Sequence, residues 1–235
     1  GMPRAGSPQM ERIWASHWLA EGPMELPDIP KLAAKARNRG GIAKLSAAEA
    51  RALGEAYLRD TRIQRKSGKP FYIDKLPNNW LHIGFIHLIL PNAKIIDARR
   101  HPMDCCFSNF KQHFARGQAF SYSLTDMGRY YAVFVDLAGH FDTVLPERIH
   151  RVIHERLIDD LEGEVRALLD YLGLPFEEAC LAFHTNGRAV RTASSEQVRR
   201  PINSDGVGQW RMMEPWLQPL KDALGPILTH YPDAP

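Results

Sequence analysis

Apolar residues recur along this chain with two different periods in alternating stretches. Spacings of three and four residues predict amphipathic helices, and short apolar runs bounded by Pro or Gly predict buried strands. The predicted helices cover about residues 9–16, 29–37, 47–64, 78–90, 103–115, 123–144 and 161–172. The predicted strands cover about residues 71–74, 94–98 and 150–153. Strands that alternate with helices predict an α/β fold, a parallel sheet with helices on both faces.

Local signals fix several of these boundaries. Ser46 precedes the helix of residues 47–64, and Glu49 follows it by three residues, which is the spacing of a capping box. Pro102 stands at the first turn of a helix, where its missing N–H costs nothing. Gly173 follows the helix of residues 161–172 and is expected to end it.

Composition narrows the class of protein. With 235 residues, 44% apolar and 24% charged, and no repeat, the chain is expected to form one domain over residues 1–235. A net charge of +3, with the basic residues spread out, predicts no nucleic-acid partner. The longest apolar run, residues 80–90, is too short to span a bilayer, and no secretory signal opens the sequence. We therefore expect no membrane partner. The three cysteines show no metal-ligand spacing and no disulfide framework, which favours a metal-free protein of the cytoplasm.

The first eight residues, GMPRAGSP, have the layout of a loop that binds an anion. Gly1 and Gly6 flank the loop, and a hydroxyl residue and a helix follow, so that backbone N–H groups can close on an anion at the helix N-terminus. A Walker A motif would place Lys and then Ser or Thr after Gly6. Ser7 and Pro8 stand there instead, and Arg4 lies inside the loop. This pattern favours a phosphosulfate or a similar anion over Mg-dependent NTP hydrolysis.

Two further stretches, residues 70–110 and 191–211, follow this loop along the chain. The order and approximate spacing of the three stretches match those of a known family. Together the three resemble the sulfotransferase superfamily, and most closely bacterial domains related to tyrosylprotein sulfotransferases, which are often fused to tetratricopeptide repeats. The resemblance runs from Gly1 to about Leu220. It implies a single P-loop-like domain with a parallel sheet of about four or five strands. Relatives carry a strand directly before the loop, so the first strand is expected to be missing or truncated here.

The resemblance also implies a reaction, the transfer of a sulfuryl group from 3′-phosphoadenosine-5′-phosphosulfate (PAPS) to a hydroxyl of a small molecule or peptide. Such a transfer needs a base for the acceptor proton and cations for the charge on the leaving oxygen. By resemblance, Glu25 is the base, with His17 as the competing candidate. Lys75 is the cation at the bridging oxygen, and Arg4 is a second catalytic residue that stabilises the developing charge. The residues implied to hold the phosphosulfate are Arg4 and the N–H groups of Ala5, Gly6 and Ser7.

A second group of residues is implied to hold the other end of the donor. Arg100 ends a predicted strand and Ser108 lies in the following helix, which suits a dianionic 3′-phosphate. In relatives, the loop that contains Ser194 and Gln197 covers the nucleotide. No metal is implied.

The chain departs from the family pattern at four positions. Ala5 removes a hydroxyl, and Pro8 removes a hydroxyl and a backbone donor. His154 stands where relatives usually have Tyr, and Gln209 where they usually have Arg or Lys. These changes are expected to weaken donor binding or alter its geometry.

Two alternatives therefore stay open. One is a P-loop nucleotide or small-molecule kinase, against which the missing Walker lysine counts. The other is a catalytically weakened domain that binds PAPS or its desulfonated product, 3′-phosphoadenosine 5′-phosphate (PAP).

Overall fold

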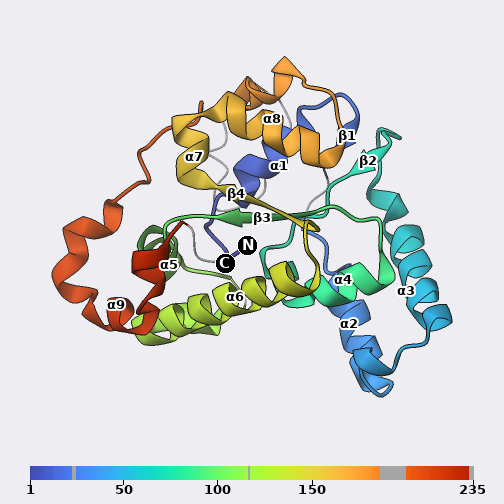
Figure 1. The fold of residues 1–235 in the computed structure, drawn as a ribbon, viewed down its shortest axis with the longest axis horizontal. Helices are drawn as coiled ribbons and strands as arrows, with labels where there is room; N and C mark the ends of the chain where they lie inside the picture. Colours follow the sequence, from blue (N-terminus) through green and yellow to red (C-terminus); the bar gives the residue numbers. More distant parts are fainter. Residues whose placement is uncertain (23–24, 116, 186–199, 233–235) are drawn as a thin grey trace.

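The computed structural model describes residues 1–235 except 23–24, 116, 186–199 and 233–235 (Figure 1). Its strands are β1 (Ala20–Glu21), β2 (Phe71–Tyr72), β3 (Ile95–Arg99) and β4 (Ile149–Ile153). Its α-helices are α1 (Ser7–Ala15), α2 (Asp28–Asn38), α3 (Ala47–Asp60), α4 (Ile83–Ile89), α5 (Pro102–Phe110), α6 (Leu124–Val144), α7 (His154–Asp159), α8 (Leu161–Leu172), α9 (Gln218–Leu224) and α10 (Ile227–His230).

The parallel pair β3–β4 forms the centre of the fold, in register from Ile95 opposite Ile149 to Arg99 opposite Ile153. Side chains alternate along β3, because successive residues of a strand point to opposite faces. Ile96 packs into the apolar cluster that α1 and α8 build on one face, whereas Ile95 packs into the cluster of α5 and α6 on the other. Figure 1 shows α7 and α8 on one side of the two strands and α6 on the other.

The expected sheet of four or five strands is not formed. Within the described residues, the strands make two separate parallel pairs, β1–β2 and β3–β4. A cavity of about 1020 Å³ separates them, and its lining includes Ile73 after β2 and Ile96 and Ala98 of β3. A hydrogen-bonded ladder needs neighbouring strands about 4.8 Å apart, so β2 and β3 cannot pair across this space.

The predicted helix ends follow their local signals closely. The capping box is present, with the N–H of Glu49 donating to Ser46 Oγ at 3.3 Å and the N–H of Ser46 donating to Glu49 Oε2 at 2.9 Å. Gly173 ends α8 in the left-handed region, with a φ of 70°. Pro102 is the first residue of α5. Each of these signals acts on the backbone within a few residues of the helix end. It therefore does not depend on how the strands are arranged into sheets.

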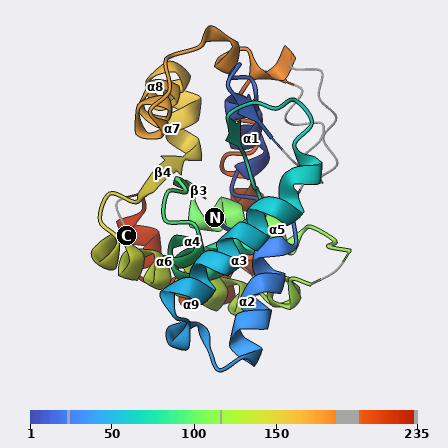
Figure 2. The same cartoon turned by 90° about the vertical axis from the view of Figure 1, so that its right-hand side faces the viewer.

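Other predicted boundaries are shifted. The helix expected over residues 47–64 is α-helical to Asp60 and continues as a 3-10 helix, Thr61–Gln64. The one expected over residues 78–90 divides into a 3-10 helix, Pro77–His82, followed by α4. Figure 2 shows α2 and α3 together at one side of the molecule, where they share an apolar cluster with α4. Among the described residues, no helix is both long and apolar enough to cross a bilayer.

Candidate active site

The loop at the start of the chain leads into α1 with two residues in the left-handed region, Arg4 at a φ of 63° and Gly6 at 96°. Glycine adopts this conformation without cost, whereas a non-glycine residue there is uncommon and typical of ligand clamps. The N–H of Ala5 donates to the carbonyl of Met2 at 3.3 Å and so closes the turn. Pro8 falls in the first turn of α1, where proline is tolerated. The N–H groups of the α1 N-terminus, and its dipole, therefore favour an anion.

Arg4, Ser108 and Arg100 come together beside this loop. The Nε of Arg4 donates to Ser108 Oγ on α5 at 3.0 Å, and Nη1 of Arg100 lies 3.5 Å from the carbonyl oxygen of Arg4. Burial lowers the pKa of Arg4, and the neighbouring Arg100 lowers it further. Guanidinium groups keep their charge in proteins, so the two cations repel each other. A bound anion would relieve this repulsion.

Side chains that the sequence did not single out hold this arrangement. Asn109 on α5 donates through Nδ2 to the carbonyl of Pro3 at 2.7 Å, which ties the loop to α5. The hydroxyl of Tyr131 on α6 donates to the carbonyl of Arg100 at 3.0 Å. Both lie on helices, and no motif in the sequence marks either of them. The loop and Arg100 are thus fixed from α5 and α6.

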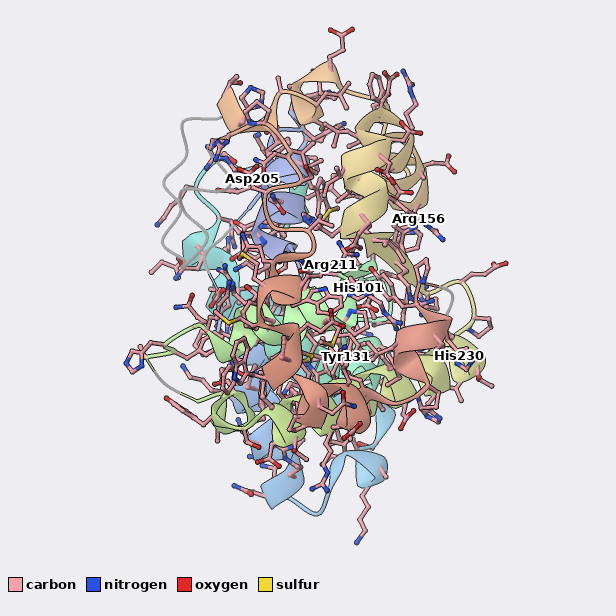
Figure 3. All side chains as sticks on the ribbon, turned by 90° about the vertical axis from the view of Figure 1, so that its left-hand side faces the viewer. His101, Tyr131, Arg156, Asp205, Arg211 and His230 are labelled. Carbon is pink, nitrogen blue, oxygen red and sulfur yellow. The ribbon has the colours of Figure 1, made fainter. Side chains whose placement is uncertain are left out.

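Residues 200–216, which we call the strap, lie against α5. Nη2 of Arg100 donates to the carbonyl of Gly206, and the N–H of Gly208 donates to Asp104 Oδ2 at 2.9 Å. Trp210 stacks on His101, with ring centroids 6.2 Å apart. Figure 3 shows Asp205 and Arg211 along this segment, with His101 beside it.

Gln209, where relatives usually carry a cation, contacts a lysine that the sequence analysis missed. Its Oε1 accepts a hydrogen bond from Lys111 Nζ at 3.0 Å. The pKa of Lys111 is lowered by burial and then by the charges of Arg100 and Arg4. Lys111 therefore adds a third positive charge near these two arginines. Its position just after α5 was the available signal, since Ser108 lies on the same helix.

Lys75 and Glu25 meet beside α1. Lys75 Nζ lies 2.5 Å from Glu25 Oε1 and 3.9 Å from Glu11 Oε2, and its side chain is only 10% exposed. Glu11 is on α1, four residues after Ser7, so both occupy the same face of that helix. This spacing could have pointed to Glu11 from the sequence. The structure thus joins the two predicted catalytic residues and adds a second carboxylate.

Asp74, next to Lys75, is a half-buried acid that accepts a hydrogen bond from a neighbouring helix. The hydroxyl of Tyr57 on α3 donates to Asp74 Oδ2 at 2.7 Å. Burial raises the pKa of Asp74 to about 6, although the hydrogen bond from Tyr57 opposes this change. Asp74 therefore titrates close to neutral pH beside the candidate catalytic lysine.

His17, the competing base candidate, is fully buried. Its Nε2 lies 3.0 Å from the carbonyl oxygen of Pro175, and its Nδ1 accepts a hydrogen bond from the N–H of Leu19 at 3.1 Å. Both ring nitrogens thus hold a turn after α1. The expected nucleotide contacts Ser194 and Gln197 lie outside the described residues.

Comparison with known proteins identifies the family of this chain. The family model described as "Sulfotransferase family" matches residues 1–178. A curated protein of Aquifex aeolicus (strain VF5), described as uncharacterized, is 33% identical over 238 residues. The match covers 95% of this chain but 31% of the Aquifex protein, so this chain spans about a third of that relative's length.

Solved structures with a similar fold are sulfotransferase domains. One is the sulfotransferase domain of the Synechococcus PCC 7002 olefin synthase, with a TM-score of 0.62, 22% identity, and coverage of 90% of this chain and 85% of that one. Another, from the curacin biosynthetic pathway, has a TM-score of 0.63, 18% identity, and coverage of 90% and 88%. The family match extends over most of the sequence, and it includes the loop, Lys75 and the Arg100–Ser108 pair. The chain belongs to the sulfotransferase family.

Proposed function

We propose that this protein transfers a sulfuryl group from PAPS to the hydroxyl of a small-molecule or peptide acceptor. The observation that supports this most is the meeting of Arg4, Ser108 and Arg100 at the N-terminal end of α1. Two cations and a hydroxyl beside a helix N-terminus suit a ligand with two separate anionic groups. PAPS has that character, because it carries a 3′-phosphate and a 5′-phosphosulfate on one adenosine.

The residues present fit this donor. Within the part of the chain that the structure describes, Nε of Arg100 is buried and has no hydrogen-bond partner, so a donor is left for a phosphate oxygen. We assign the 3′-phosphate to Arg100 and Ser108. The phosphosulfate would be held by Arg4 and by N–H groups of Ala5, Gly6 and Ser7, with Ala5 contributing least because its N–H closes the turn. Ser194 and Gln197 remain predicted contacts of the nucleotide.

Glu25 and Lys75 would carry the chemistry. When bound, PAPS supplies an activated sulfuryl group and a phosphate leaving group. Glu25 accepts the proton of the acceptor hydroxyl, which makes that oxygen a better nucleophile. Lys75 neutralises the negative charge that develops on the leaving oxygen. The ion pair at 2.5 Å holds the ammonium group of Lys75 close to the carboxylate of Glu25 before substrates arrive.

We further propose that residues 1–235 act as one domain and that the protein works in the cytoplasm without a metal. The charges needed at the donor come from side chains, namely Arg4, Arg100 and Lys75, so the proposed chemistry uses no bound cation.

Calorimetric titration with PAP and with AMP tests the donor assignment, because the two differ only in the 3′-phosphate. We expect PAP to bind about 10–100-fold more tightly, as is typical of hydrogen bonds to charged groups. Ser108→Ala should weaken PAP binding more than AMP binding, because AMP lacks the 3′-phosphate and loses only the indirect support of Arg4 by Ser108. Thr143→Ala, which removes a hydroxyl bonded only within α6, is the control.

Equal affinity for PAP and AMP would contradict the assignment. Tight PAP binding without turnover over a panel of hydroxyl acceptors would instead favour a domain that binds the donor but does not react. ATP turnover that needs Mg²⁺ would favour a kinase.

A further inference from the structure

His154, the first residue of α7, brings an imidazole to the loop directly after β4 ends. The register of β3 and β4 pairs Arg99 with Ile153, so Arg100 and His154 leave the two strands side by side at their carboxyl ends. His154 is 7% exposed. Its Nδ1 would lie 3.4 Å from a Cβ placed on Gly6, which is the residue that caps α1.

The Nδ1 atom of His154 has no protein partner in the described part of the chain, and it is buried. A buried polar atom without a partner costs free energy, so such an atom usually marks a missing ligand or water. Here it faces the N-terminus of a nine-residue helix, which itself favours an anion. These are two independent observations at one place, a helix N-terminus and an unpartnered imidazole nitrogen turned toward it.

The charged groups around His154 come from three elements. Arg100 follows β3, Asp104 lies on α5 and Glu155 is on α7 itself. Both carboxylates are engaged elsewhere, Asp104 by the N–H of Gly208 and Glu155 by the N–H of His101. Burial lowers the pKa of His154, and Arg100 lowers it further, so the ring is neutral at neutral pH before an anion arrives.

We infer that His154 donates a hydrogen bond from Nδ1 to the anion bound at the start of α1, and that its imidazole gains a proton when that anion binds. The identity of the anion, the 5′-phosphosulfate of PAPS or the 5′-phosphate of PAP, rests on the proposed function. The proton comes from solvent and adds to Nε2, while Nδ1–H keeps its hydrogen bond. Since binding takes up a proton, affinity rises as pH falls.

The test is calorimetry with PAP at about pH 8 and about pH 6, the range in which histidine titrates. His154→Phe should lose about 10–100-fold in PAP affinity because it removes a hydrogen bond to a charged group. His154→Tyr should recover most of this affinity but not the extra gain at low pH, because its hydroxyl does not titrate there. The phosphates of PAP also titrate in this range, and they do so equally for both proteins. The ratio of the PAP affinity of the wild type to that of His154→Tyr at each pH therefore removes their contribution.

His150→Phe is the matched control, because His150 is a histidine of β4, the strand that leads into His154. The His150 ring stacks on Tyr171, with centroids 5.0 Å apart, and not on the loop. This variant should keep both the affinity for PAP and its pH dependence. Equal PAP affinity in wild type and His154→Phe would overturn the inference.

Histidine NMR of the wild-type protein gives a second readout that does not depend on any variant folding. The pKa of the His154 ring should rise when PAP or inorganic sulfate is added. A rise with sulfate but no preference for PAP over AMP would contradict the proposed donor and support the His154 site. No change with either ligand would contradict the role of His154.

Discussion

At the scale of single residues, Lys75 is informative because two carboxylates lie near its ammonium group. Its ammonium group lies close to the carboxylates of Glu25 and Glu11, on the face of α1 that follows the loop. The two acids differ in exposure, since the side chain of Glu25 is 41% exposed and that of Glu11 is 18% exposed. Glu25 is therefore the one that an acceptor can reach from solvent, and Glu11 is placed to hold Lys75.

Glu25→Gln tests this distinction. Removing the base should lower turnover about 10²–10⁴-fold, the usual contribution of general base catalysis, and leave PAP affinity within about twofold. Glu11→Gln removes the other carboxylate near Lys75 and leaves the proposed base in place. It should lower turnover about fivefold or less. The measurement is steady-state turnover beside calorimetry. Comparable losses in the two variants would show that charge around Lys75, rather than a base, is what matters.

Asp74 predicts a dependence of stability on pH. Its pKa is raised to about 6 by burial, so the folded state binds a proton more tightly than the unfolded chain does. Stability from this group is therefore complete below the unfolded pKa and falls as pH rises through about 6. Asp74→Asn should raise the free energy of unfolding at about pH 8 by about 1–3 kcal/mol, and by much less at about pH 4.

Urea unfolding at the two pH values measures this difference. Tyr57→Phe is the paired variant, because it removes the hydroxyl that donates to Asp74 Oδ2, and it should destabilise the protein more at high pH. A difference between Asp74→Asn and wild type that does not change with pH would contradict the assignment.

At the scale of elements, the contact between α3 and α4 depends on Gly54. A Cβ added to Gly54 would lie 2.0 Å from the carbonyl oxygen of Ile89, a backbone atom at the end of α4. Backbone cannot move aside without separating the helices. The glycine is therefore required by the close approach of α4, and not by the conformation of α3.

Gly54→Ala should lower the free energy of unfolding by about 1–3 kcal/mol, in spite of the better helix propensity of alanine. Gly84→Ala on α4 is a suitable control, because its added Cβ would lie 3.3 Å from the ring of Phe141, which can turn. Thermal or urea unfolding measures both. If Gly54→Ala proved as stable as wild type, the helix contact described here would be wrong.

The elements also show which parts of the fold the sequence predicts. Helix ends with their own chemistry, such as the capping box of α3 and Gly173 after α8, are confirmed. Short elements were missed, among them β1 with two residues and α7 with six, since they are too short to show a period. Tertiary contacts decide these segments, and a single sequence does not display such contacts.

For the whole molecule, strand alternation predicted the parallel arrangement but not which strands pair. A cavity lies between β2 and β3, and the sequence pattern alone did not predict it. The candidate site was more predictable. Resemblance named the loop, Lys75, Arg100 and Ser108 as candidates, and they stay predictions. Glu11, Lys111 and Asn109 were added from their neighbours in the structure.

One guanidinium links two distant stretches of the chain. Arg100 already donates to the carbonyl of Gly206 in the strap, and the same fork is assigned to a phosphate. Any ligand that draws Arg100 toward itself changes how firmly residues 200–208 are seated, and thermodynamic reciprocity requires the converse by an equal factor. Binding of the proposed donor at Arg100 and packing of the strap against α5 are therefore expected to affect each other.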